Sequence, residues 1–156
     1  MKGLHLLGII LVLSAALYAL PCHAVCFYPG SLLSGYHIPL KTEVKTSPAI
    51  IIGKVVHVQF VPPDSSETDS VNSYLYTVER LQELKGHVPQ RVLLYATNDS
   101  GGYRMRLGET DLLFLTPLGT KFTADVCGNS TELPKGAYVV SEVRKLLGQS
   151  GAQPKK

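Results

Sequence analysis

This 156-residue sequence lacks long apolar runs, excess charge of one sign and recognisable catalytic motifs. Its longest apolar run, residues 6–20, has 15 residues, whereas a transmembrane helix needs about 20, so we expect no stable membrane anchor. The net charge is only +3, too small to favour a nucleic-acid partner. The length suits one domain, and neither an internal repeat nor a domain linker is present.

Motifs for chemistry are also missing. No Ser/His/Asp or Cys/His arrangement occurs, and Gly101-Gly102 lacks the strand-to-helix context of a phosphate loop. His57 lies on a strand face that turns polar and His87 in a turn, so both are expected at the surface. Glu109 and Asp111 open a strand and are expected to be solvated. The sequence therefore predicts no enzyme, with no catalytic residues, no metal and no cofactor.

Residues 1–24 have the pattern of a secretory signal peptide. Lys2 supplies the positive end, residues 6–20 the apolar region, Pro21 a break, and Cys22-His23-Ala24 a small-x-small cleavage site. Cleavage after Ala24 would leave residues 25–156 as a secreted or periplasmic chain. Loss of Lys2 leaves 14 basic residues against 12 acidic ones, a net charge of +2.

Cysteine is scarce, and its positions are informative. Cys22 would leave with the signal peptide, so only Cys26 and Cys127 would remain. Two cysteines in an oxidising compartment favour one disulfide. The alternative is a metal pair assisted by His57 or His87, although no close Cys/His spacing supports it.

Five segments have the composition of short strands separated by turns. The first, residues 49–60, is rich in β-branched residues and ends at Pro62-Pro63. Gly53 marks a bulge or bend within it; before Gly53 both faces are apolar, and after it Val56, Val58 and Phe60 are expected to share one face. The other strands are predicted at residues 73–84, 91–97, 110–116 and 121–127, the last with Phe122, Ala124 and Val126 facing inward.

The remaining segments frame this β structure. Residues 25–47 have no clean periodicity and are expected to lie extended over it, with one helical turn at 41–45. Residues 62–72 read as a polar loop. Residues 136–147 show helical apolar spacing and predict an amphipathic helix ended by Gly148, followed by a disordered tail at 149–156. One domain, residues 25–148, is predicted, with a barrel or sandwich fold.

The order of these features resembles the netrin-like domain, in the version found in tissue inhibitors of metalloproteinases and their bacterial relatives. The matching pieces, in chain order, are residues 49–55, 76–78 with 84–86, 91–92, 107–109 with 112–114, and 127–130. The resemblance implies a mostly β fold: a five-stranded OB-type barrel, here with a C-terminal amphipathic helix. It also implies a disulfide between Cys26 and Cys127.

The inhibitory device of that family is only partly matched. In the animal inhibitors the mature chain begins Cys-x-Cys, and the first cysteine chelates the zinc of the protease. Ala24 stands where that cysteine would be, and its disulfide partner would fall near residues 101–103, which contain no cysteine. The resemblance therefore implies the fold and the second disulfide more directly than it implies zinc chelation.

We expect a secreted, non-enzymatic and monomeric module that binds an extracellular or periplasmic protein, with a zinc metalloprotease as one candidate partner. The predicted contact surface has two halves that are adjacent in the family fold: Val25, Cys26, Phe27, Tyr28 and Pro29, and the loop Asn98, Asp99, Ser100, Gly101, Gly102 and Tyr103. The alternative is a polyanion- or matrix-binding module that uses Lys41, Lys45, Lys54, Arg104 and Arg106.

Two further patterns bear on partners. OB barrels can bind single-stranded nucleic acid on aromatic platforms, but Tyr74, Tyr76 and Tyr95 are expected to be core or half-buried barrel residues. Asn98 and Asn129 each begin an Asn-x-Ser/Thr pattern for N-glycosylation.

Overall fold

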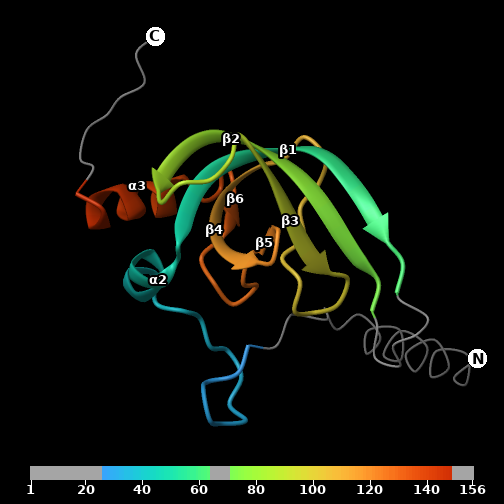
Figure 1. Ribbon diagram of the computed structural model, residues 1–156. Coiled ribbons are helices and arrows are strands. Elements are labelled where there is room, and N and C mark those ends of the chain that lie inside the picture. The colour runs from blue at the N-terminus through green and yellow to red at the C-terminus, as the bar shows by residue number, and fades with distance from the viewer. Residues whose placement is uncertain (1–25, 64–70, 149–156) are drawn as a thin grey trace, which may run out of the picture.

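The computed structural model describes residues 26–63 and 71–148, so the predicted signal peptide, the predicted tail and most of the predicted polar loop lie outside the described residues. Within that part the fold is mostly β, with six strands and two helices (Figure 1). The elements are α2 (Leu40–Thr46), β1 (Ala49–Val61), β2 (Ser73–Lys85), β3 (Arg91–Thr97), β4 (Thr110–Leu118), β5 (Lys121–Thr123), β6 (Thr131–Glu132) and α3 (Ala137–Leu146). None of the described helices is long and apolar enough to cross a membrane.

Five of the strands close into a ring of the OB-barrel type, which confirms the predicted fold class. The order around the sheet is β1-β2-β3-β5-β4, and β1 also pairs with β4 to complete the circuit. All neighbours are antiparallel except β3 and β5, which meet in parallel at the single pair Leu94–Phe122. The short β6 pairs with Asp111 and Leu112 of β4, on the edge opposite β1.

The first half of β1 is buried on both faces because it separates two apolar cores. Ile51 points into the ring with Tyr76, Leu94 and Leu113. Ile50, one residue earlier, points the other way, into a second core formed with the two helices. That second core contains Val44 of α2, Leu84 of β2, Leu112 and Phe114 of β4, and Val139, Val140 and Val143 of α3.

Three register shifts interrupt the pairing of β1 with β2. One falls between Ile50 and Ile51, one between Ile52 and Gly53, as the glycine predicted, and one between Val55 and His57. The first and third shifts were not predicted, and the third reverses which side chains of β1 face inward. Val55 is buried whereas Val56 is 38% exposed, so the expectation that Val56 and Val58 share one face is wrong, because a bulge adds one residue to the strand.

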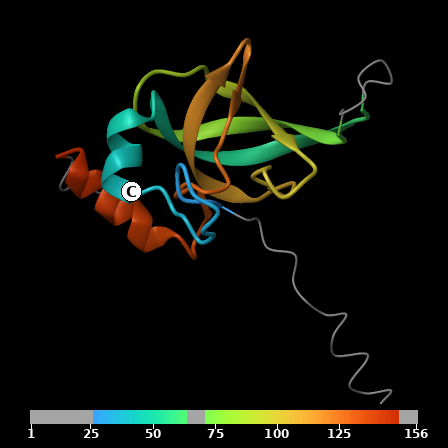
Figure 2. The ribbon, with the colours of Figure 1, turned by 90° about the horizontal axis from the view of Figure 1, so that it is seen from below.

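Both helices lie on one side of the ring and pack against each other (Figure 2). The predicted turn at 41–45 is a full helix, α2, whose C-terminal end is capped by a side chain from β2. Lys85 Nζ donates to the carbonyl oxygens of Val44 and Lys45 at 2.7 and 2.9 Å, which places a cation at the negative end of the helix. α3 confirms the predicted amphipathic helix, and Arg144 Nη2 ties it to Gln82 Oε1 of β2 at 2.8 Å.

Two local expectations are wrong. β5 stops at Thr123 rather than reaching Cys127, because Asp125 turns the chain: its Oδ1 accepts a hydrogen bond from Cys127 N at 2.8 Å. Ala124 is nevertheless buried, and Phe122 packs against the ring core. The segment before α2 does not lie extended over the barrel; it forms a small hairpin that projects from the ring (blue in Figure 1).

Candidate binding surface

The projecting segment, residues 26–36, is called the N-terminal hairpin below. Its two arms meet at an antiparallel bridge between Phe27 and Ser34. Tyr28 N donates to Leu33 O, and Tyr36 N donates to Cys26 O, both at 2.9 Å. Gly30 supplies the turn with a φ of +74°, a conformation that residues with a Cβ adopt at a steric cost.

The hairpin is fixed to the ring at its base. Cys26 is disulfide-bonded to Cys127 with a Cα–Cα distance of 5.7 Å, which confirms the predicted pair. Ile38 N also donates to Cys127 O at 2.9 Å. A disulfide that closes a loop of this length contributes about 4–5 kcal/mol in the chain-entropy model, and such bonds persist in oxidising compartments.

Apolar side chains of the hairpin, from its base to its free end, face solvent. Leu32 is 93% exposed, Leu33 70%, Phe27 51% and Tyr28 49%. The ring of Tyr28 contacts that of Tyr36 edge-on, with centroids 5.4 Å apart, so the hairpin has a small aromatic core of its own. Clustered exposed apolar side chains on an ordered segment are typical of interaction sites.

The second half of the predicted surface, residues 98–103, is an ordered turn. Asp99 Oδ1 accepts hydrogen bonds from Thr97 Oγ1 at 2.7 Å and from Gly101 N at 2.9 Å, and these bonds lower the pKa of Asp99. Gly102 lies so close to the Thr97 carbonyl that a Cβ there would overlap it. The hydroxyl of Tyr103 is not free to donate to a partner protein, because it donates to Asp111 Oδ1 at 2.8 Å.

The two predicted halves are connected through residues 125–127. Gly102 forms an antiparallel bridge with Asp125, and Cys127, two residues later, is bonded to Cys26. The turn and the base of the hairpin therefore adjoin the same short segment. Val25 lies outside the described residues. Leu32 and Leu33, which are the most exposed apolar residues of the hairpin, were not predicted; the run Gly30-Ser31-Leu32-Leu33 between turn formers was the signal available.

The expectation that Asp111 is solvated is wrong, because only 1% of its surface is exposed. It follows Thr110 into β4, which is covered by β1 on one edge, β6 on the other and packed cores on both faces. Burial raises the pKa of Asp111 to about 6, although the Tyr103 bond opposes this, and the nearby Glu109 and Glu132 raise it further. Its Oδ2 has no hydrogen-bond partner among the described residues.

The side-chain amide of Asn129 is hydrogen-bonded within the protein. Its Nδ2 donates to Ile38 O at 2.8 Å and to Glu43 Oε2 at 2.6 Å, so the amide nitrogen of this N-glycosylation pattern is already engaged. His57 and His87 are exposed, as expected. Within residues 26–63 and 71–148, no group of three or more His, Cys, Asp or Glu side chains could hold a metal ion.

The five cations of the alternative site fall into separate places. Lys41 and Lys45 lie on α2, beside the start of β1, and Lys54 lies on β1 opposite Thr110. Arg104 and Arg106 flank the buried Met105 in the loop before β4. The structure thus brings the two arginines together and leaves the lysines elsewhere.

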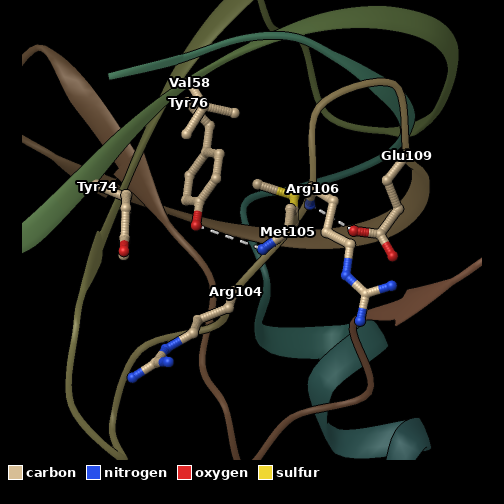
Figure 3. Close-up of a pocket in the computed structure, with 7 residues that line it drawn as sticks. All are labelled: Val58, Tyr74, Tyr76, Arg104, Met105, Arg106 and Glu109. Atoms are coloured by element: carbon tan, nitrogen blue, oxygen red, sulfur yellow. Dashed lines mark hydrogen bonds between the residues drawn. The ribbon is translucent and has the colours of Figure 1, made fainter. Parts of the chain in front are cut away.

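The arginines border a pocket of about 410 Å³, called the Tyr76 pocket below and shown in Figure 3. It is lined by Val58 of β1, Tyr74 and Tyr76 of β2, and Arg104, Met105, Arg106 and Glu109 of the loop. Tyr76 is 2% exposed and Tyr74 is half-buried, as predicted for barrel tyrosines. The Tyr76 hydroxyl accepts a long hydrogen bond from Met105 N at 3.4 Å, which joins the two walls (Figure 3).

No protein-family model matches this chain, and a comparison with curated proteins finds no match. The resemblance to the netrin-like domain therefore remains a prediction from the sequence.

Proposed function

We propose that this protein is a secreted, non-enzymatic, netrin-like module that binds another protein through the tip of its N-terminal hairpin. The observation that carries the proposal is the exposure of Leu32, Leu33, Phe27 and Tyr28 on a segment anchored by a disulfide. Burying such side chains against a partner removes apolar surface from water, which favours association. An anchored hairpin loses less conformational freedom on binding than a free segment does.

The partner would present an apolar groove that accepts two leucines and an aromatic ring. A zinc metalloprotease remains one candidate, on the strength of the resemblance. Ala24 stands at the position of the zinc-chelating cysteine of the animal inhibitors. Inhibition would therefore depend on the hairpin occupying the substrate groove of the protease rather than on a chelating cysteine.

The test compares surface variants in a capture experiment from the native extracellular fraction. Leu32→Ser with Leu33→Ser should abolish retention of the partner that the unchanged protein retains. Two exposed apolar residues elsewhere serve as matched controls: Leu81→Ser on β2, 56% exposed, and Tyr138→Ala on α3, 73% exposed. Both controls should retain the partner. Equal loss in the controls, or no loss in the hairpin variant, would reject this surface.

Inhibition is tested separately, by titrating the protein against a panel of purified zinc proteases. Inhibition that the hairpin variant loses and the Tyr138→Ala variant keeps would support the protease partner. Absence of inhibition at micromolar excess would exclude a zinc protease as the partner. Binding to another protein would still be decided by the capture experiment.

A further inference from the structure

The far half of β1 has a strand neighbour on one side only. β4 pairs with residues 49–54 of β1, and the chain just before β4 adds two bonds: Val55 N donates to Glu109 O at 2.9 Å, and Gly108 N donates to Val55 O at 2.8 Å. From residue 57 to residue 61, β1 pairs with β2 alone within the described part of the chain, and Val56 is the extra residue of the bulge. Figure 1 shows this arrowhead end of β1 at the margin of the sheet.

The composition of this open edge favours pairing. Residues 56–61 read Val-His-Val-Gln-Phe-Val and contain no Lys, Arg, Asp, Glu or Pro. Proteins commonly protect free edges with such residues or with bulges. Here the bulge is confined to Val56, the first residue of the segment, and the exposed side chains include Phe60, 51% exposed and in edge-on contact with Tyr74 at 5.8 Å. An extended segment could therefore add to this edge as a further strand.

The Tyr76 pocket lies beside the same edge, and its charged side chains determine which ligands the edge would favour. Val58 belongs to the open segment and also lines the pocket. On the facing wall, the side chains of Arg104 and Arg106 are exposed and extend from the loop on either side of Met105 (Figure 3). The one carboxylate in the lining, that of Glu109, accepts a hydrogen bond from Arg106 N at 2.6 Å. Two cations thus border the groove, and they favour an anionic occupant.

We propose that residues 56–61 of β1 and the Tyr76 pocket together form a second binding site, for an extended acidic peptide of a partner protein. The peptide lies beside β1 past the point where the pairing with β4 and Glu109 stops. Its backbone forms hydrogen bonds with the open edge of β1. Alternate side chains of a strand face the same way, so every second residue projects over the pocket, where a carboxylate meets Arg104 or Arg106. The site shares no residue with the N-terminal hairpin and does not depend on its function.

The experiment uses fluorescently labelled peptides of about nine residues, the upper range of common strand lengths, and measures anisotropy with the purified full mature chain. A peptide of alternating threonine and glutamate should bind about tenfold or more tightly than one of alternating threonine and lysine. Two versions of the glutamate peptide carry N-methyl groups, one at every threonine amide and the other at every glutamate amide. At least one of them should lose binding, because the methyl group removes the backbone donor.

Charge reversal tests the pocket. Arg104→Glu with Arg106→Glu should weaken the glutamate peptide about tenfold or more, whereas Lys135→Glu, an exposed cation before α3, should change it less than about twofold. The milder pair Arg104→Gln and Arg106→Gln gives the same comparison if the reversed variant folds poorly. Unchanged binding in both arginine variants, or full binding by both methylated peptides, would overturn the proposal. Displacement of the peptide by inorganic sulfate at constant ionic strength would also overturn it, in favour of a simple anion site.

Discussion

Glu43 Oε2 lies 2.7 Å from the backbone nitrogen of Asn129 and 2.6 Å from its Nδ2, although 86 residues separate the two. Glu43 is in α2 and only 4% exposed. Burial raises the pKa of its carboxyl, and the two bonds from Asn129 oppose that rise. The pair fixes α2 to the loop that follows Cys127, and so holds the helix beside the base of the N-terminal hairpin.

Asn129→Ala should lower the free energy of unfolding by about 1–3 kcal/mol, because it removes the two side-chain bonds from Nδ2 and leaves Glu43 and the Ile38 carbonyl less satisfied. Urea denaturation measures the change. Glu142→Ala, on the exposed face of α3 where Glu142 pairs with Lys145, is the matched control and should alter stability by less than about 0.5 kcal/mol. An Asn129 variant as stable as the control would show that the buried pair contributes nothing.

Asp111 should make stability depend on pH between about 4 and about 6. Its pKa rises from 3.8 to about 6 on folding, mainly because it is buried, so the folded protein binds a proton that the unfolded chain has released. The stability this contributes is fully present below about pH 4 and is lost as the pH rises through about 6, on the order of 3 kcal/mol. Denaturation curves across this range measure it.

Asp111→Asn removes that titration, so the variant should gain stability relative to the unchanged protein as the pH rises from 4 to 7. Tyr103→Phe removes the hydroxyl that favours the ionised carboxylate and should move the midpoint of the pH dependence upward. Parallel curves for the unchanged protein and Asp111→Asn would refute the assignment.

Gly102 is required for the approach of its turn to β3. A Cβ at Gly102 would overlap the Thr97 carbonyl oxygen, whereas one at Gly101 would meet Asp99 Oδ1 at 3.4 Å. Gly102→Ala should therefore destabilise the protein by about 2 kcal/mol or more, and Gly101→Ala by much less. Thermal unfolding of the two variants, side by side, checks the prediction; equal midpoints would contradict it.

The disulfide should hold the N-terminal hairpin in place as well as stabilise the ring. Cys26→Ser with Cys127→Ser should lower stability by about 4 kcal/mol and increase proteolytic cleavage within residues 26–36. Free-thiol labelling of the protein purified without reductant should find neither Cys26 nor Cys127 reactive. Labelling of both thiols would show that the disulfide at the base of the hairpin is absent from the protein.

Local pattern predicted much of the ring. β3 begins and ends where its composition placed it, β1 and β2 differ from prediction by one residue at their ends, and Gly53 marks a register shift as expected. Strand alternation and turn residues are local properties, and they suffice for these elements. The chain path around Asp125 depends on a side-chain hydrogen bond, and no alternation pattern reports such a bond.

Residues outside that pattern were harder to place. Asp111 is buried because β1, β6 and two cores surround it, and none of these is adjacent in sequence. The two-residue β6 is too short to carry a periodicity. Within the hairpin, turns and a single bridge replace regular alternation, so the sequence indicated an apolar N-terminal surface through Phe27 and Tyr28 without its shape or its most exposed members.

The parallel contact between β3 and β5 consists of the one pair Leu94–Phe122, while β1 is held by β2 along its length and by β4 over its first half. This contrast makes the β3–β5 junction a seam in the ring. Opening the ring at this seam breaks the fewest ladder hydrogen bonds, so amide hydrogen exchange should be fast along the β3–β5 junction. It should be slowest at residues 50–54, which pair with a strand on each side.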